Sequence, residues 1–259
     1  MATFLWSDIV FGPIHSRRVG TSLGINLLPV CGKLCTFDCI YCECGSMDSG
    51  APKKDRRMPS YEQVAEAMSS RFKELFDQGV KVDSISFTGN GEPTLNKDFP
   101  AIVDKTVELR DKYFPAAVIS VFSNSTTLDR PGVFDALMKV DNRIMKVDCS
   151  DIQILKDVNR PAGRFSLEKV LENLERFKGD FILQTMFFKG VVEGREIDLT
   201  APELVAGWLD IVRRLRPYRI MAYSLDRDTP VDGLVKIGRE RLQEITAPLR
   251  DEGFDVEIF

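Results

Sequence analysis

Residues Cys35 to Cys42 read CTFDCIYC, which sets three cysteines in a C-x3-C-x2-C pattern. Three thiols on one short loop favour a metal site, and a cytosolic chain would not keep them oxidised as disulfides. Zinc sites usually take two C-x2-C pairs, or one pair and two histidines. This chain has a single histidine, His15, and no second such pair. The spacing therefore favours an iron–sulfur cluster over zinc.

The number of cysteines on this loop matters for the cluster. A cubane cluster is normally held by four cysteine thiolates, one for each iron. Cys35, Cys39 and Cys42 supply three, so one iron is left for a ligand that the chain does not provide. We predict that these three cysteines are the metal ligands.

The pattern resembles the radical S-adenosylmethionine superfamily, in which C-x3-C-x2-C carries a 4Fe-4S cluster and an aromatic residue usually precedes the last cysteine. Tyr41 stands in that place and is predicted to contact the cofactors. The resemblance implies one 4Fe-4S cluster and S-adenosyl-L-methionine as cofactors, and chemistry of the oxidoreductase class. In that chemistry the cluster reductively cleaves S-adenosylmethionine to a 5′-deoxyadenosyl radical, which abstracts hydrogen from a substrate. The cofactors carry the reaction, and the protein positions and shields them.

The composition of the 259 residues is that of a globular enzyme, with 44% hydrophobic and 29% charged residues. A net charge of −4 gives no basic footprint for nucleic acid, which weakens a polynucleotide substrate without excluding one. No signal peptide and no run of roughly 18 apolar residues is evident, so we expect a cytoplasmic protein without membrane contact. One domain over 1–259 is expected, with an N-terminal strand extension at 1–21, a core at 22–230 and a final helix and strand at 231–259.

Strand and helix patterns alternate along the core. After a short strand and turn near 9–21, the predicted strands are 23–28, 82–87, 117–122, 143–147, 181–188, 219–223 and a terminal 254–259. The predicted helices are 61–76, 98–113, 131–139, 166–178, 201–214 and 239–250, with a solvated connection at 52–57. Six βα units imply a parallel sheet with right-handed crossovers. Six are too few to close an eight-stranded barrel, so we predict an α/β fold of the partial (β/α)6, TIM-like type, as the resemblance also implies. A doubly wound open sheet is the alternative.

In parallel α/β folds, functional side chains collect at the carboxyl ends of the strands. The loop after the second core strand contains Gly89, Asn90, Gly91 and Glu92. In the resembled family a Gly-Gly-Glu motif here binds the methionine amino group, and Asn90 replaces its middle residue. We predict that all four contact the cofactor, with Glu92 as the partner of the ammonium. A plain glycine-rich turn is the alternative.

Polar residues also end the next two strands, namely Ser123 with Asn124, and Asp148. The resemblance implies that such residues hold the ribose and the methionine carboxylate, although they could instead cap the helices that follow. Lys146 alternates with Asp148 and so points to the same side of the strand, where it could neutralise a carboxylate or pair with Asp148.

The last two core strands offer Gln184, Tyr223 and Arg227. In the resembled family, aromatic and backbone groups here frame the adenine, so these three are predicted to reach the cofactor. Arg160 could contact a substrate or form a surface ion pair.

Three further cysteines are Cys31, Cys44 and Cys149. They lack the close spacing of a second cluster, and buried, inert cysteine is the common state. Cys149 ends a predicted strand and is the candidate catalytic residue, as a hydrogen-atom donor.

The segments 11–42, 88–94, 184–186 and 226–230 resemble the wyosine-synthase-like branch of the superfamily. Those relatives carry further cysteines upstream of the cluster loop, whereas this chain has none before Cys31. The substrate is therefore left open between a small molecule, a peptide, a protein and transfer RNA. The alternatives are a glycyl-radical-activating enzyme acting on a partner protein, a wyosine-like base-modifying enzyme, and a non-catalytic iron–sulfur protein. An external one-electron donor such as a flavodoxin or ferredoxin is the expected partner.

Overall fold

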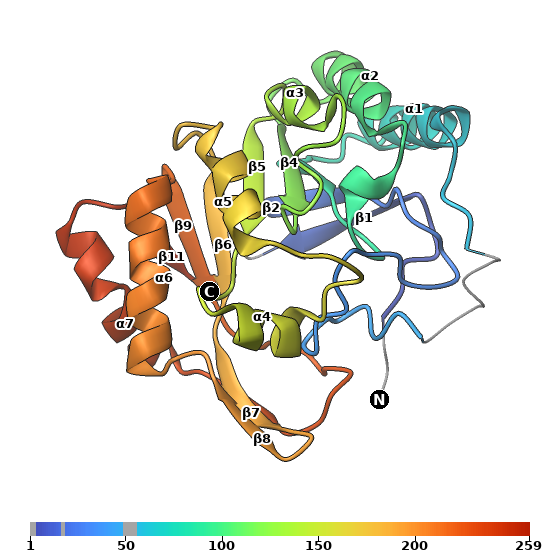
Figure 1. The fold of residues 1–259 in the computed structure, drawn as a ribbon. Helices are drawn as coiled ribbons and strands as arrows, with labels where there is room; N and C mark the ends of the chain where they lie inside the picture. The colour runs from blue at the N-terminus through green and yellow to red at the C-terminus, as the bar shows by residue number, and fades with distance from the viewer. Residues whose placement is uncertain (1–3, 17–18, 49–55) are drawn as a thin grey trace.

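The computed structural model describes residues 4–16, 19–48 and 56–259 (Figure 1). Arg17, Arg18 and most of the predicted connection at 52–57 lie outside these ranges. In the part described, no helix is long and apolar enough to span a membrane.

One sheet organises the described residues, and its parallel strands lie side by side in chain order. The strands are β2 (Gly20–Ile25), β3 (Ser84–Phe87), β4 (Val118–Ser123), β5 (Asn142–Lys146), β6 (Ile182–Met186), β9 (Arg219–Tyr223) and β11 (Val256–Ile258). At one edge, β1 (Val10–Ser16) pairs antiparallel with β2. The order without reversals is that of a partial barrel, and the doubly wound alternative is wrong.

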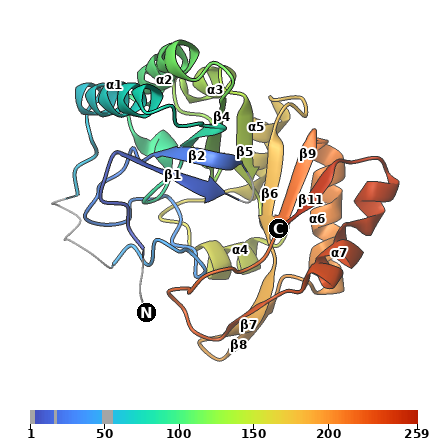
Figure 2. The ribbon, with the colours of Figure 1, turned by 180° about the vertical axis from the view of Figure 1, so that it is seen from behind.

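Helices follow most of these strands and cover the outer face of the sheet (Figures 1 and 2). They are α1 (Tyr61–Asp77), α2 (Phe99–Tyr113), α3 (Val133–Leu137), α5 (Leu167–Glu175), α6 (Pro202–Leu215) and α7 (Arg239–Asp251). Helix α1 illustrates the local cause. Ser60 and Gln63 form a capping box at its start, and Val64, Met68 and Phe72 bury one face at helical spacing. The predicted alternation and fold class are confirmed.

The first core strand ends earlier than predicted. Strand β2 stops at Ile25, although 23–28 was expected with Pro29 as its terminator. The Asn26 side chain explains the difference, because its Oδ1 accepts the backbone N–H of Leu28 at 3.2 Å and that of Asn90 at 3.1 Å. A side chain that hydrogen-bonds nearby backbone groups takes the place of the strand-to-strand hydrogen bonds that would otherwise extend β2.

A small second sheet was not predicted. It has the order β10 (Leu234–Lys236), β7 (Phe188–Val192) and β8 (Arg195–Asp198). Strands β7 and β8 form a hairpin whose turn residues Glu193 and Gly194 both have positive φ, 52° and 77°. This is the backbone that two-residue hairpins require. The predicted strand 181–188 corresponds to β6 and the first residue of β7, with Phe187 between them.

Helix α4 (Ile152–Asn159) was also not predicted. The Asp151 carboxylate caps it by accepting the N–H groups of Gln153 at 2.7 Å and Ile154 at 2.9 Å. The segment that follows β2 and carries the three predicted ligand cysteines, residues 26–45, is called the cysteine loop. Together with helix α4 and the small sheet, it lies at the carboxyl ends of the parallel strands (Figures 1 and 2).

Candidate functional site

The cysteine loop follows β2 and is tied to the loop after β3. The N–H of Leu34 donates to the carbonyl of Asn90 at 2.8 Å, and the carbonyl of Leu34 accepts the N–H of Glu92 at 3.2 Å. Gly91, with φ of 139°, lies so close that a Cβ atom there would stand 1.9 Å from the Leu34 carbonyl oxygen. A residue with a side chain would therefore displace the cysteine loop.

Gly89, Asn90 and Gly91 of the Gly-Asn-Gly-Glu segment make close contacts with other parts of the chain. A Cβ atom at Gly89 would stand 2.3 Å from Oδ1 of Asn26. The Asn90 side chain donates to the carbonyls of Trp6 and Pro29, both at 2.9 Å, and accepts the N–H of Trp6 at 2.9 Å. The sequence assigned Gly89, Asn90 and Gly91 to the cofactor. Their close contacts hold this loop against neighbouring parts of the chain, and their contact with the cofactor stays a prediction.

Glu92 is buried beside the cysteine loop and faces the end of β4. Its carboxylate accepts the N–H of Asn124 at 2.6 Å and the hydroxyl of Thr94 at 2.5 Å, and it also bonds the Ser123 side chain. Burial raises its pKa in spite of these donors. Burial, as the larger cause, and the negative charge of Glu92 together raise the pKa of Cys35 to about 12. Ser123 and Asn124 thus meet Glu92 and the cysteine loop, as predicted for residues of one site.

The three loop thiols differ in their electrostatic surroundings. Burial raises the pKa of Cys39 as it does that of Cys35. The pKa of Cys42 is lowered to about 6, chiefly by a hydrogen bond from the thiol of Cys44 and further by Lys33, against the effect of burial. The described cysteines are all free thiols. All three predicted ligands are therefore available as thiolates once metal binding releases their protons to solvent.

Lys33 was not singled out in the sequence. Its side chain is 1% exposed, and its ammonium bonds the Asp38 carboxylate and the Gly45 carbonyl, each at 3.0 Å. Burial lowers the pKa of Lys33, but the negative charges of Cys42, Cys39, Cys35 and Asp38 outweigh it and raise the pKa above its usual value. The sequence offered only a lysine two positions before Cys35, and that position alone does not reveal that the side chain is buried.

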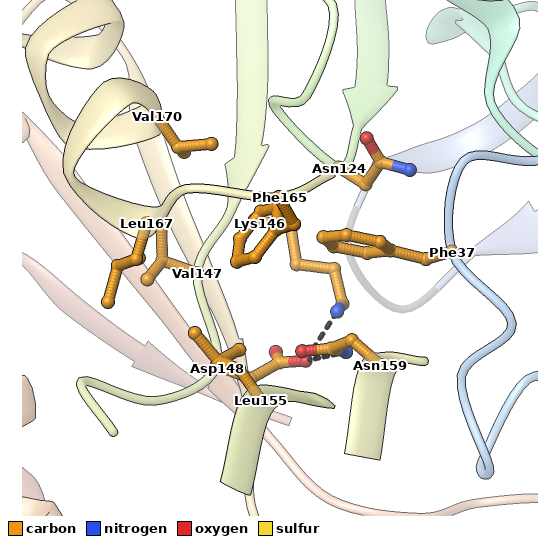
Figure 3. A pocket seen from close by; sticks show the side chains of 10 residues that line it. All are labelled: Phe37, Asn124, Lys146, Val147, Asp148, Leu155, Asn159, Phe165, Leu167 and Val170. Carbon is orange, nitrogen blue, oxygen red and sulfur yellow. Dashed lines mark hydrogen bonds and ion pairs between the residues drawn. The ribbon is translucent and has the colours of Figure 1, made fainter. Parts of the chain in front are cut away.

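Asp148 is the centre of a second buried group (Figure 3). Its carboxylate forms an ion pair with Lys146 and accepts hydrogen bonds from the hydroxyl of Tyr41 at 2.5 Å and from Nδ2 of Asn159 at 2.8 Å. The N–H of Met186 donates to its other oxygen at 3.2 Å. The pairing of Lys146 with Asp148, one of two roles expected for the lysine, is confirmed.

This second group reaches the cysteine loop and lines a cavity. The ammonium of Lys146 lies 3.9 Å from Sγ of Cys39 and 5.1 Å from the ring centre of Tyr41. Burial lowers the pKa of Lys146, and Asp148 and Cys39 raise it to a net value above the ordinary range. The cavity is lined by Asn124, Lys146, Asp148 and Asn159 together with apolar residues of the cysteine loop, α4, α5 and the segment just before α5, namely Phe37, Leu155, Phe165, Leu167 and Val170.

The remaining predicted residues lie toward β6 and β9. Gln184 is 6% exposed on β6, in register with Lys146 of β5. Tyr223 and Arg227 line a cavity that Tyr41 and Met186 also line. The guanidinium of Arg227 is exposed and pairs with Glu43 of the cysteine loop at 3.0 Å. Arg160 pairs with Glu193 at 2.9 Å on the surface, the second of its two expected roles.

Cys149 lies apart from both cavities. It is 2% exposed, and its Sγ accepts the N–H of Asp151 at 3.3 Å beside the start of α4. Burial raises its pKa to about 11. Cys149 is not among the residues that line the cavity beside Asp148, and its role as a hydrogen-atom donor stays a prediction.

Cys149 is expected to resist alkylation by iodoacetamide at pH 8. A thiol with a pKa near 11 is about one part in a thousand thiolate there, and only the thiolate reacts. Peptide mapping by mass spectrometry over time measures the rate, and the exposed Cys31 serves as the internal reference. Labelling of Cys149 at the rate of Cys31 would contradict the burial described above.

Comparison with known proteins places the chain in a family. The model of the radical SAM superfamily matches residues 30–197. The UPF0026 protein MJ1312 of Methanocaldococcus jannaschii is 35% identical over 188 residues, which are 71% of this chain and 55% of that protein. The chain therefore spans about half the length of this relative.

Solved structures share the fold at low sequence identity. A radical SAM methyltransferase from Sphaerobacter thermophilus has a TM-score of 0.64 at 13% identity, over 92% of this chain and 65% of that one. SuiB of Streptococcus suis bound to S-adenosylmethionine has a TM-score of 0.62 at 14% identity, over 88% and 48%. Archaeal TYW1 follows with 0.51 at 13% identity, over 90% and 72%. These likenesses confirm the partial TIM-like barrel.

Proposed function

The chain belongs to the radical S-adenosylmethionine superfamily, and on this premise we propose that it is an iron–sulfur oxidoreductase that acts on a substrate by hydrogen abstraction. Membership implies one 4Fe-4S cluster and S-adenosylmethionine as cofactors. When bound, the cluster supplies one electron that cleaves S-adenosylmethionine to methionine and a 5′-deoxyadenosyl radical, and that radical takes a hydrogen atom from the substrate. The residues of this chain bind, orient and shield the reactants.

The observation that carries the proposal is the meeting of the cysteine loop with two buried carboxylates at one edge of the sheet. The backbone N–H of Glu92 donates to the Leu34 carbonyl of the loop at 3.2 Å, and the Asp148 carboxylate accepts a hydrogen bond from Tyr41 of the loop itself at 2.5 Å. Cys35, Cys39 and Cys42 fit a cluster that takes one thiolate for each of three irons. Among the described residues, no three His, Cys, Asp or Glu side chains stand at the spacing of a single metal ion's ligands. A four-iron cluster needs no such close triad.

We assign roles to the other residues by their place around the loop. Glu92 supplies negative charge beside Cys35 for the ammonium of S-adenosylmethionine. Ser123 and Asn124 fix that carboxylate and the loop, and Asp148 holds Tyr41 in position. Tyr223 and Arg227, which share a cavity with Tyr41, are proposed to contact the adenine, with Gln184 beneath them.

The proposal extends to partners and setting. An external one-electron donor of the flavodoxin or ferredoxin kind would reduce the cluster. We propose a cytoplasmic setting, because free thiols persist in a reducing compartment. Residues 1–259 are proposed to act as a single domain, since one sheet joins strands from β1 to β11.

Glu92→Gln is expected to weaken the binding of S-adenosylmethionine to the cluster-loaded protein by about tenfold to a hundredfold. A hydrogen bond to a charged group contributes about 1.5–3 kcal/mol, and the amide lacks the charge that attracts the ammonium. Equilibrium dialysis under anaerobic conditions measures Kd. Glu108→Gln, on the exposed face of α2, is the matched control and should leave Kd unchanged. Equal Kd values for the two variants would remove Glu92 from the binding site.

A further inference from the structure

Side-chain N–H donors surround the sulfur atoms of the predicted cluster ligands. The Nδ2 atom of Asn124, at the end of β4, lies 3.4 Å from Sγ of Cys35. The Nδ2 atom of Asn159, the last residue of α4, lies 3.3 Å from Sγ of Cys39. Both asparagines are buried, with exposures of 8% and 0%. Two of the three sulfurs therefore receive an amide donor from a segment distant in the sequence.

Two ammonium groups complete this arrangement. Lys146 lies 3.9 Å from Sγ of Cys39, and Lys33 bonds the carbonyl of Gly45, whose N–H donates to the carbonyl of Cys42. Their side chains are 12% and 1% exposed. Each lysine has a carboxylate partner, Asp148 or Asp38, so both ammonium groups are held in place inside the protein. Cys35 and Cys39 thus each have a buried side-chain donor, and a second buried cation lies in the segment that carries Cys42.

The orientation of the Asn159 side chain leaves one of its polar atoms without a hydrogen bond. Its Nδ2 serves three acceptors, namely Sγ of Cys39, the Tyr41 hydroxyl and the Asp148 carboxylate. Its Oδ1 is buried without a hydrogen-bond partner, although an unsatisfied buried polar atom destabilises a fold by about 1–3 kcal/mol. Figure 3 shows this amide beside the ammonium of Lys146 and the carboxylate of Asp148. The amide is therefore turned toward the sulfur and its neighbours at the expense of its own oxygen.

We infer that Lys33, Asn124, Lys146 and Asn159 set the reduction potential of the cluster, as positioning residues that stabilise its reduced state. The inference rests on the proposed function, because it requires a cluster on Cys35, Cys39 and Cys42. It goes beyond that function by assigning these four residues a role toward the cluster itself.

The physical reason is the sign of the charge. Reduction adds one electron from the external donor to a group already held by three thiolates, and no covalent bond forms or breaks. Net charge and hydrogen bonds to the sulfurs are the main controls of an iron–sulfur potential. Buried cations interact with that added charge more strongly than solvated ones do. Removal of a donor therefore makes the cluster harder to reduce.

The test is a redox titration of the reconstituted protein, followed by electron paramagnetic resonance without S-adenosylmethionine. Lys33→Met and Lys146→Met are each expected to lower the ratio of reduced to oxidised cluster at a fixed solution potential by about tenfold, which is 59 mV for one electron. Asn159→Leu keeps the ion pair of Lys146 with Asp148 and should shift the ratio in the same direction by a smaller factor. Lys73→Met, which removes a charge from an exposed pair on α1, is the control and should leave the ratio unchanged.

Two results would overturn the inference. One is a ratio within about threefold of the wild type in variants that carry full iron and sulfide. The other is loss of the cluster from all three variants while circular dichroism shows an intact fold, because these residues would then hold the cluster and not tune it. A wild-type protein that takes up no cluster would instead refute the proposed function, so the two failures are distinguishable.

Discussion

Cys39→Ala protein is expected to retain no more than about a tenth of the iron and sulfide of the wild type after anaerobic reconstitution. With two thiolates left on the loop, two irons of a cubane would lack a protein ligand. Cys39 also contacts Lys146 and Asn159 from other segments of the chain. Chemical analysis of iron and sulfide together with the visible absorption spectrum measures the loss.

The matched control for this loss is Cys31→Ala. Cys31 is an exposed thiol four residues before Cys35, outside the C-x3-C-x2-C pattern. Its replacement should leave the iron content unchanged. If Cys39→Ala still held a full cluster and Cys31→Ala did not, the ligand set would have to be reassigned.

The second large effect is expected for Asp148→Ala, which should reduce the free energy of unfolding by about 3–5 kcal/mol. The substitution leaves the ammonium of Lys146 buried without its counter-ion. It also removes the acceptor of the Tyr41 hydroxyl and of the Asn159 amide. Urea unfolding of the cluster-free protein measures the difference.

Two further variants of this chain serve as controls for that measurement. Asp77→Ala breaks an exposed ion pair with Lys73 and should cost no more than about 1 kcal/mol. The double variant Lys146→Met, Asp148→Asn removes both buried charges and should recover most of the lost stability. An Asp148→Ala protein no less stable than Asp77→Ala would mean that the buried network does not support the fold.

The sequence was sufficient for the order of the core elements because their hydrophobic patterns are strong. Six βα units and a terminal strand were predicted, and the parallel sheet confirms them. The errors fall where a side chain or a tight turn decides the backbone. Asn26 ends β2 early, the turn at Glu193 and Gly194 forms a hairpin that was not predicted, and Asp151 starts a short helix that was missed.

The site was predictable to the extent that strand ends converge in a parallel sheet. Glu92, Asn124 and Asp148 were chosen for this reason, and the structure sets each of them beside the cysteine loop. The glycines and Asn90 were chosen by resemblance to a motif. Their backbone contacts with Leu34 and Asn26 depend on loop geometry that spacing does not reveal.

Lys33 and Asn159 were missed as parts of the site for a related reason. A lysine and an asparagine are usually exposed, so their burial against thiols becomes evident only from the packed structure. Lys33 stands two residues before Cys35, whereas Asn159 reaches Cys39 from the end of a helix that was not predicted.

Formation of 5′-deoxyadenosine tests the central claim most directly. Anaerobically reconstituted protein is reduced, mixed with S-adenosylmethionine and analysed by liquid chromatography with mass spectrometry, alongside the Cys39→Ala protein under identical conditions. We expect 5′-deoxyadenosine and methionine from the wild type and neither from Cys39→Ala. Wild-type protein with a full, reduced cluster that binds S-adenosylmethionine and yields neither product would contradict the account.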